Sequence, residues 1–233
     1  MGTQPGKVVA IVVAAGCGKR MGRKIPKQFL EIRGKPIVVY TLEKFDLCAE
    51  VDEVILVVQA EHVQDARNML NECGIRKVCQ VVAGGPQRQD SVQSGLKNLP
   101  EGVEIVIVHD AVRPFVSVEK IEEVVEAARD GGAAVLATHV KDTTKRGKHR
   151  WVEETLDRDD LWHVQTPQCF RVNWIAEGYE RARQDGYSTT DDAALVERLG
   201  YRVKIVEGED RNIKITSPVD LFLAEIYVSM GDE

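Results

Sequence analysis

This chain of 233 residues has few cysteines and no pattern among them. Its five cysteines are scattered and form no CxxC pair, so neither a zinc site nor a disulfide framework is expected, and the cytoplasm is the expected compartment. No apolar run approaches the roughly 20 residues of a membrane-spanning helix, so we expect no membrane partner. The formal net charge of −6 argues against nucleic acid as a partner. The length and the 43% hydrophobic content predict a single domain over residues 1–233.

Two common phosphate-binding glycine patterns are also missing. A P-loop needs Ser or Thr after its Gly-Lys pair, but Gly18-Lys19 is followed by Arg20. A dinucleotide fingerprint needs a third glycine where Met21 stands, although Gly16 and Gly18 match the first two. An NAD-dependent dehydrogenase is therefore disfavoured.

Short β-rich apolar runs alternate with amphipathic helical patterns along the chain. The runs are Val8–Val13, Val54–Val58, Val78–Val82, Ile105–Val108, Ala133–Thr138 and Val203–Val206. Most of them are continuously apolar, which is typical of parallel strands covered on both faces. A helix is predicted after Ser117, and another after Ser217-Pro218, where Asp220 completes a capping box. This alternation predicts an α/β fold with a doubly wound, mostly parallel sheet.

The segment from His139 to His163 interrupts that alternation. It is polar, lacks a helical period and carries Lys145-Arg146-Gly147-Lys148 at its centre. We interpret it as a β-hairpin arm that projects from the sheet, although a mobile surface loop would have a similar composition. Because an isolated ribbon is marginally stable, the arm should pack against a second subunit.

The loop after the first apolar run has the composition of an anion site. Val8–Val13 leads into small residues and Gly16, and the cations Lys19, Arg20 and Lys27 follow. Small residues allow the backbone N–H groups to approach phosphate oxygens, and the cations neutralise the charge. A locally basic loop on an acidic chain suggests a polyanionic small molecule as the ligand.

Three further segments follow strands and should face the same crevice, because ligands of such sheets bind beyond the carboxyl ends of the strands. Gly84–Ser91 offers a sharp glycine turn with Arg88 and Ser91 behind it. Asp110 follows the fourth apolar run and is a natural Mg²⁺ ligand. Lys214, between two β-branched residues, follows the last run. Each of these alone is also compatible with an ordinary turn, helix cap or surface lysine.

Taken together and in order, these segments resemble those of a known enzyme family. The chain resembles the 2-C-methyl-D-erythritol 4-phosphate cytidylyltransferases from about Val8 to Tyr227. The motifs that carry it are Ala14-Ala15-Gly16, Arg20-Met21, Pro26-Lys27-Gln28, Gly84-Gly85-x-x-Arg88-x-x-Ser91, His109-Asp110-Ala111-x-Arg113-Pro114, Asp142-Thr143-x-Lys145-Arg146, Thr155-x-Asp157-Arg158, Thr166-Pro167-Gln168 and Asn212-Ile213-Lys214.

The resemblance implies a Rossmann-like fold of the nucleotide-diphospho-sugar transferase type and a cytoplasmic homodimer joined by arms at about residues 139–163. It implies that CTP and 2-C-methyl-D-erythritol 4-phosphate condense to 4-diphosphocytidyl-2-C-methyl-D-erythritol and pyrophosphate, with Mg²⁺ or another divalent cation. The implied catalytic residues are Arg20, Lys27 and Lys214. The implied CTP-binding residues are Ala14, Ala15, Gly16, Gly85, Arg88, Ser91 and Ala111. The implied substrate-binding residues are Asp110, Arg113, Thr143, Arg158 and Thr166, with Asp110 also binding the metal.

Two other functions remain open from the sequence. A CTP:ribitol-5-phosphate cytidylyltransferase would share the loops and the reaction but take a different polyol phosphate. A nucleotide-binding module without chemistry would need only part of the site. We expect no catalytic role for His109 or His163, because an ionised phosphate nucleophile needs no general base and phosphoryl chemistry can proceed by positioning and electrostatics.

Overall fold

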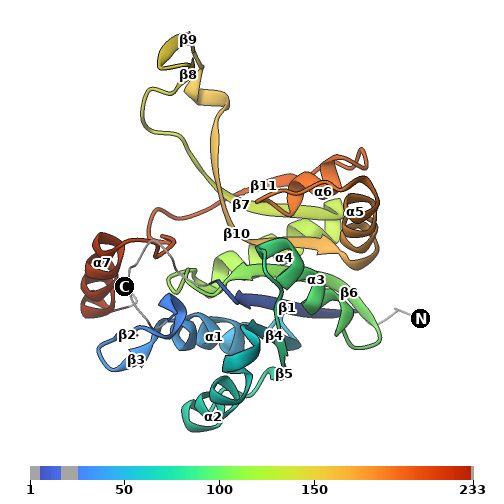
Figure 1. Ribbon diagram of the computed structural model, residues 1–233, viewed down its shortest axis with the longest axis vertical. Coiled ribbons are helices and arrows are strands. Elements are labelled where there is room, and N and C mark those ends of the chain that lie inside the picture. The colour runs from blue at the N-terminus through green and yellow to red at the C-terminus, as the bar shows by residue number, and fades with distance from the viewer. Residues whose placement is uncertain (1–5, 17–25, 232–233) are drawn as a thin grey trace.

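The computed structural model describes residues 6–16 and 26–231, and within them a central sheet of seven strands has the order β11–β7–β10–β6–β1–β4–β5 (Figure 1). Its strands are β1 (Lys7–Ala14), β4 (Glu53–Val58), β5 (Val78–Ala83), β6 (Val103–Asp110), β7 (Ala133–His139), β10 (Trp162–Arg171) and β11 (Lys204–Glu207). The pairs between neighbouring strands are parallel, except that β10 runs antiparallel to both β6 and β7. The predicted mostly parallel α/β sheet is therefore confirmed.

The six strands that the apolar runs predicted are all present, with ends displaced by at most two residues. Strand β10 was not predicted. Its centre contains the polar residues Gln165, Thr166 and Gln168, which are buried and whose side chains are satisfied by hydrogen bonds. The placement of His109 and Asp110 after a strand was also wrong, because they are the last two residues of β6.

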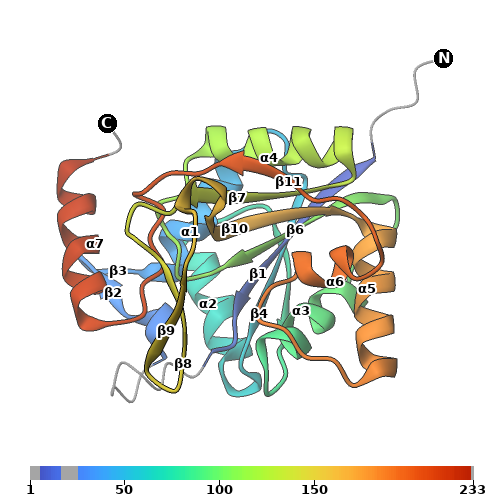
Figure 2. The same ribbon diagram turned by 90° about the horizontal axis from the view of Figure 1, so that it is seen from above.

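Helices cover both faces of the sheet, as Figure 2 shows for α4 and α5 on opposite sides. The helices are α1 (Ile37–Leu47), α2 (Val63–Cys73), α3 (Arg88–Lys97), α4 (Val118–Gly131), α5 (Val172–Asp185), α6 (Ala193–Glu197) and α7 (Pro218–Met230). Alternate residues of β1 enter opposite cores: Val8 and Val12 pack with α1, α2 and α4, whereas Val9 and Ile11 pack with α3, α5 and α6. The two-residue period of a strand thus explains why its apolar run is continuous.

The capping residues expected from the sequence begin their helices. The Ser117 hydroxyl accepts from the backbone N–H of Lys120 at the start of α4. Ser217 and Asp220 form the reciprocal capping box of α7. Helix α7 packs through Ala224 against the short strand β2 (Glu31–Ile32), which pairs with β3 (Lys35–Pro36). The segment before α7 is fixed by a hydrogen bond from the Ile215 N–H to the carbonyl of Val112, which brings Lys214 beside the end of β6.

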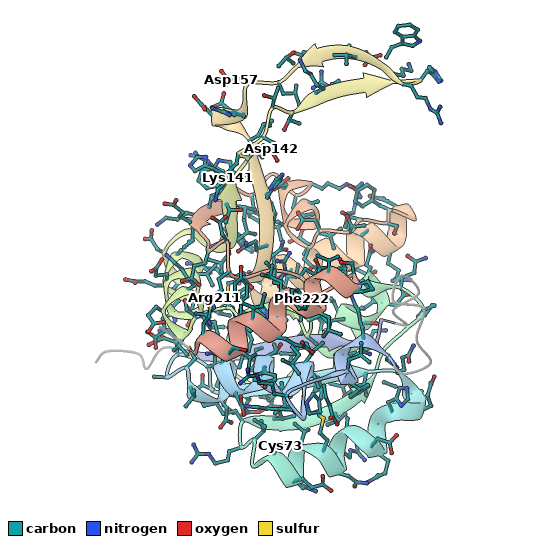
Figure 3. The ribbon with its side chains drawn as sticks, turned by 90° about the vertical axis from the view of Figure 1, so that its left-hand side faces the viewer. Cys73, Lys141, Asp142, Asp157, Arg211 and Phe222 are labelled. Carbon is teal, nitrogen blue, oxygen red and sulfur yellow. The ribbon has the colours of Figure 1, made fainter. Side chains whose placement is uncertain are left out.

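A hairpin of β8 (Lys145–Lys148) and β9 (Trp151–Thr155) projects from the sheet, followed by a short 3₁₀ turn, Arg158–Asp160. Figure 3 shows Asp142 and Asp157 at its base, clear of the sheet and of α7. The predicted arm is present, although Trp162 and His163 belong to β10. In the described part of the chain, no helix has the length and apolarity to cross a bilayer.

Replacing Gly132 by Ala should destabilise the protein, because this residue ends α4 with a φ of +88° and a Cβ there would lie 2.2 Å from the ring of Trp174. A left-handed alanine costs about 1–2 kcal/mol, and overpacking adds about 1–3 kcal/mol. We expect urea denaturation to show a total loss of about 2–5 kcal/mol. Gly131→Ala is the matched control, because a Cβ at Gly131 has nothing within 4 Å. Equal stabilities of the two variants would contradict this account.

Candidate active site

A cavity of about 400 Å³ lies at the carboxyl ends of β1, β4, β5 and β6. Its volume is in the range of small-molecule sites. The residues that line it come from six separate segments: Val13–Gly16, Lys27-Gln28, Gln59–Glu61, Gly84–Arg88 with Ser91, Asp110 with Val112, and Lys214. The three strand-end segments and Lys214, which we expected to share one crevice, therefore do so.

The glycine pair after β5 allows the backbone to pass closely between neighbours. A Cβ on Gly84 would lie 2.6 Å from the Cβ of Ala15 and 2.7 Å from the hydroxyl of Ser91. A Cβ on Gly85 would lie 2.4 Å from the Cβ of Asp90. Neither glycine has a positive φ, so close approach explains these glycines better than the sharp turn we expected. The Ser91 hydroxyl also accepts from the Gly85 N–H at 3.2 Å.

Lys27 and Lys214 lie on the same side of this cavity. The Lys27 ammonium donates to the carbonyl of Ile215 at 3.2 Å, next to Lys214 in the chain. The neighbouring Gln28 is buried and donates from its amide to the carbonyl of Ala14. The turn that carries Lys27 is thereby tied to the end of β1. Two cations from distant parts of the sequence thus line one cavity.

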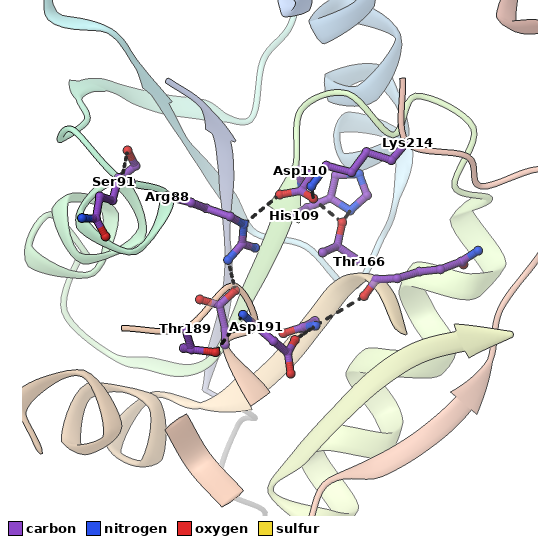
Figure 4. Close-up of polar contacts among 12 residues, drawn as sticks. Arg88, Ser91, His109, Asp110, Thr166, Thr189, Asp191 and Lys214 are labelled. Carbon is purple, nitrogen blue, oxygen red and sulfur yellow. Dashed lines mark hydrogen bonds and ion pairs between the residues drawn. The ribbon is translucent and has the colours of Figure 1, made fainter. Parts of the chain in front are cut away.

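The Asp110 carboxylate lies between two cations (Figure 4). Its Oδ1 accepts from Arg88 Nε at 3.0 Å, and its Oδ2 lies 2.6 Å from Lys214 Nζ. Burial alone would raise the pKa of Asp110, but Arg88, Lys214 and Arg113 together hold it well below the usual range of a carboxyl group. Asp110 is therefore ionised at neutral pH.

A second cavity of about 320 Å³ adjoins the first. Arg88, Asp110 and Lys214 line both cavities. The other residues that line the second cavity are Arg113, Val164, Gln165, Thr166, Gln168, Thr190 and Asp191. An ionic cluster between two cavities, with a buried carboxylate and two partly exposed cations, is the arrangement expected of a site where two anionic molecules meet.

The comparisons with known proteins identify the family. The family model for 2-C-methyl-D-erythritol 4-phosphate cytidylyltransferase matches residues 8–230. The chain belongs to this family. A relative from Geobacillus kaustophilus is 49% identical over 220 residues, which cover 94% of this chain and 96% of that protein. One from Alkaliphilus metalliredigens is 45% identical over 221 residues, which cover 94% and 92%.

Solved structures of the family agree with this fold. The 4-diphosphocytidyl-2C-methyl-D-erythritol synthase of Anaerococcus prevotii superposes with a TM-score of 0.86 at 33% identity, over 97% of both chains. The 2-C-methyl-D-erythritol 4-phosphate cytidylyltransferase of Thermus thermophilus gives a TM-score of 0.78 at 32% identity, over 94% of this chain and 98% of that one. The similarity therefore covers the arm as well as the sheet.

Some residues that the family resemblance singled out do not line either cavity. Thr143 and Arg158 lie on the arm, where Arg158 donates to the carbonyl of Lys141 at 2.9 Å. Ala111 is fully buried, and its N–H donates to the carbonyl of Val13. Arg20 lies outside the described residues. Within one chain, the arm residues thus contribute nothing to the cavities.

Two buried residues behind the site were missed by the sequence reasoning. Asp192, which precedes α6, accepts from Arg88 Nη1 at 2.6 Å, and Tyr179 of α5 donates to Asp192 at 2.5 Å. The Asp191-Asp192 pair before a short helix was the available signal in the sequence. Nothing in its spacing pointed to Arg88, which is 104 residues away.

His109 connects the end of β6 to β10. Thr166 is within hydrogen-bond distance of His109 Nδ1 at 3.2 Å and accepts from the Asp110 N–H at 3.1 Å. The other ring nitrogen lies 3.1 Å from the carbonyl of Arg113 and donates to it. Burial lowers the pKa of His109 to about 3, so the ring is neutral at pH 7. His109 therefore fixes Asp110 and Arg113 in place rather than exchanging protons with a substrate.

This burial predicts an acid-sensitive stability. Between the ordinary histidine pKa of 6.5 and about 3, the unfolded chain binds a proton at His109 that the folded protein excludes. The free energy of unfolding should therefore fall as the pH falls below about 6, by roughly 1.4 kcal/mol per pH unit from this group. His109→Gln should remove this component, which urea denaturation at pH 7, 6 and 5 would measure. Parallel pH dependences for wild type and variant would show that the ring is not buried in its neutral form.

Proposed function

We propose that this protein transfers a cytidylyl group from CTP to 2-C-methyl-D-erythritol 4-phosphate, giving 4-diphosphocytidyl-2-C-methyl-D-erythritol and pyrophosphate. The observation that carries the proposal is the Arg88–Asp110–Lys214 cluster between two adjoining cavities, in a chain that belongs to this family. The first cavity, with Gly16, Gly85 and Ser91, would hold CTP. The second, with Arg113 and Thr166, would hold the sugar phosphate.

In the proposed reaction, a phosphate oxygen of the acceptor attacks the α-phosphorus of CTP in line. A new P–O bond forms, the bond from the α-phosphorus to the oxygen bridging it to the β-phosphorus breaks, and pyrophosphate leaves with the electron pair. Lys27, Lys214 and Arg20 would stabilise the charge that develops on the α-phosphoryl oxygens and on the leaving group. The attacking phosphate is ionised at pH 7, so no general base is required. The neutral, buried His109 is consistent with that.

Asp110 is the proposed ligand for Mg²⁺ or another divalent cation. Mg²⁺ is commonly bound by one or two carboxylates together with substrate phosphates, and Asp110 offers an ionised carboxylate to both cavities. The described residues contain no cluster of three or more His, Cys, Asp and Glu side chains that could hold a metal. A single carboxylate, that of Asp110, fits a cation that is bound mainly by the phosphates of the substrates. When bound, such an ion would neutralise phosphate charge.

We further propose that the protein is a homodimer in which each arm completes the site of the partner. The arm extends from the sheet and exposes Trp151 and Val152, which are 79% and 65% accessible. Thr143 and Arg158 reach neither cavity of their own chain, which supports a contribution across a subunit interface.

Arg158→Ala should chiefly weaken binding of the sugar phosphate. A charge-assisted hydrogen bond contributes about 1.5–3 kcal/mol, so the KM for the acceptor should rise about 10- to 100-fold while the KM for CTP stays within twofold. Steady-state kinetics with each substrate varied would measure this. Arg146→Ala, on the same arm and paired with Glu154, is the control and should change neither KM. A change in the KM for CTP alone would contradict the assignment of the arm.

Subunit complementation tests whether Arg158 acts across the dimer. A heterodimer of one Lys27→Ala chain and one Arg158→Ala chain contains one intact site if the arm acts on the partner, and none if it acts on its own chain. We expect co-expressed chains to recover up to about half of the wild-type activity. No recovery in a verified heterodimer would contradict the arrangement.

The activity itself is tested by pyrophosphate release from CTP with a small panel of polyol phosphates. We expect turnover with 2-C-methyl-D-erythritol 4-phosphate and much less with ribitol 5-phosphate. Faster turnover with ribitol 5-phosphate would assign the other polyol as the substrate. CTP binding without pyrophosphate release from any acceptor would indicate a nucleotide-binding module.

A further inference from the structure

Five side chains form a continuous row of polar contacts from the core to the candidate site. The Tyr179 hydroxyl donates to Asp192 Oδ1 at 2.5 Å, and Asp192 Oδ2 accepts from Arg88 Nη1 at 2.6 Å. Arg88 Nε donates to Asp110 Oδ1 at 3.0 Å, and Lys214 lies 2.6 Å from Asp110 Oδ2. Charges of opposite sign alternate along the row from Asp192 to Lys214.

The inner end of this row lies far from solvent. Tyr179 is 3% exposed and Asp192 is 2% exposed. Neither residue lines either cavity, so neither can contact a substrate there. Asp192 precedes α6, Tyr179 lies in the middle of α5, and both helices belong to the core on the α3 face of the sheet. The side chain of Asp192 contacts the residues of the site through Arg88.

The contacts of Arg88 explain why such support is needed. Arg88 is the first residue of α3, and its side chain crosses to β6 at the boundary of the two cavities. Its guanidinium group presents donors in a rigid planar fork, so two separated carboxylates fix the plane as well as the position. A hydrogen bond to Asp110 alone would leave the guanidinium group of Arg88 free to rotate about that bond. Asp192 holds the opposite edge, and Tyr179 fixes Asp192.

We propose that Asp192 and Tyr179 are positioning residues that act through Arg88 to orient the Asp110 carboxylate between the two substrate cavities. This inference rests on the proposed function, because it concerns the same site. It separates the two acidic partners of Arg88 by role: Asp110 faces the substrates, whereas Asp192 holds the arginine from behind. It also makes the hydroxyl of Tyr179, rather than its ring, the group that matters for turnover.

Tyr179→Phe is the principal test, because it removes the hydroxyl and keeps the ring in the core. A misplaced group in an active site lowers turnover steeply, so we expect kcat to fall about tenfold. The KM for CTP should change less than kcat does, because Gly16, Gly85 and Ser91 are unaffected and Arg88 keeps its bond to Asp110. Tyr40→Phe is the matched control: its hydroxyl donates to the carbonyl of Ile32 at 2.9 Å, in a part-buried contact away from the site. It should keep the wild-type kcat.

A double-mutant cycle distinguishes positioning from general loosening. Asp192→Asn should lower kcat about 30-fold. The double variant Asp192→Asn/Tyr179→Phe should be no slower than Asp192→Asn alone, because Tyr179 is proposed to act through Asp192. Multiplicative losses in the double variant would overturn the inference. A change in kcat below twofold for Tyr179→Phe would also overturn it, as would an equal loss in Tyr40→Phe.

Failure of this inference is distinguishable from failure of the proposed function. If wild-type protein releases pyrophosphate from CTP and the acceptor but Tyr179→Phe matches it, only the positioning role is wrong. If the wild type releases none with any acceptor, the function itself is wrong. Should Asp192→Asn fail to fold, Tyr179→Phe and Tyr40→Phe still decide the question, since both keep an aromatic ring of nearly the same volume.

Discussion

Lys27→Ala is expected to lower kcat by about 10²–10³-fold, the range for removal of one preorganised electrostatic contact. Lys27 lines the proposed CTP cavity, and its ammonium is directed to the carbonyl of Ile215, beside Lys214. A cation fixed in this way acts most strongly when negative charge builds up on the transferred group, so kcat should fall more than the KM for CTP rises.

Single-turnover measurements of pyrophosphate release would separate this effect from product release. Lys97→Ala, at the exposed end of α3, is the control for loss of a lysine charge and should keep the wild-type rate. The thermal midpoint of Lys27→Ala should change little, since the lysine is at the cavity rather than in the core. A loss of less than threefold in kcat would exclude Lys27 from the catalytic step.

Asp110→Asn should produce the second large loss, a fall in kcat of at least about 10²-fold. The substitution keeps the shape of the side chain but removes the negative charge that Arg88 and Lys214 share. Both cations would then lie beside a neutral amide, and the proposed Mg²⁺ ligand would be gone. Removing one member of a buried charge cluster is also destabilising, by about 3–5 kcal/mol.

Two measurements distinguish the catalytic from the structural part of this loss. The Mg²⁺ concentration for half-maximal activity should rise in Asp110→Asn, which a loss of stability alone would not cause. Asp185→Asn is the control, because Asp185 pairs with Arg181 and Arg198 on the surface away from both cavities. Asp110→Asn with wild-type turnover and an unchanged Mg²⁺ requirement would remove Asp110 from the site.

The sequence predicted the parallel part of the fold well because burial on both faces leaves a direct trace in composition. Continuous apolar runs such as Val54–Val58 mark strands that lie between two layers of helices. The antiparallel strand β10 leaves no such trace, because Gln165, Thr166 and Gln168 are buried through hydrogen bonds to residues distant in sequence. Polar composition alone cannot distinguish such a strand from a loop.

The residues of the candidate site likewise include some that the sequence could place and some that it could not. Residues next to strand ends, such as Gly16, Gly84 and Asp110, could be placed at the crevice because the topology of a parallel sheet brings strand ends together. Asp192 and Tyr179 could not, because their relation to Arg88 depends on how α5 and α6 pack on the sheet. Whether Thr143 and Arg158 complete a site depends on a second chain, which no pattern within one chain specifies.

The arm leaves the sheet from β7 and returns through the adjacent β10, where Trp162 is paired with His139 and their rings lie 3.6 Å apart. The N–H of Val140 donates to the carbonyl of Leu161 directly beyond that pair. The two ends of the arm are therefore held together by contacts at its base that do not involve the hairpin itself. We expect the segment between residues 141 and 160 to be exchangeable without re-registering the sheet, at the cost of the proposed roles of Thr143 and Arg158. This position is therefore a natural place to graft a foreign segment or to redesign how copies of the protein associate.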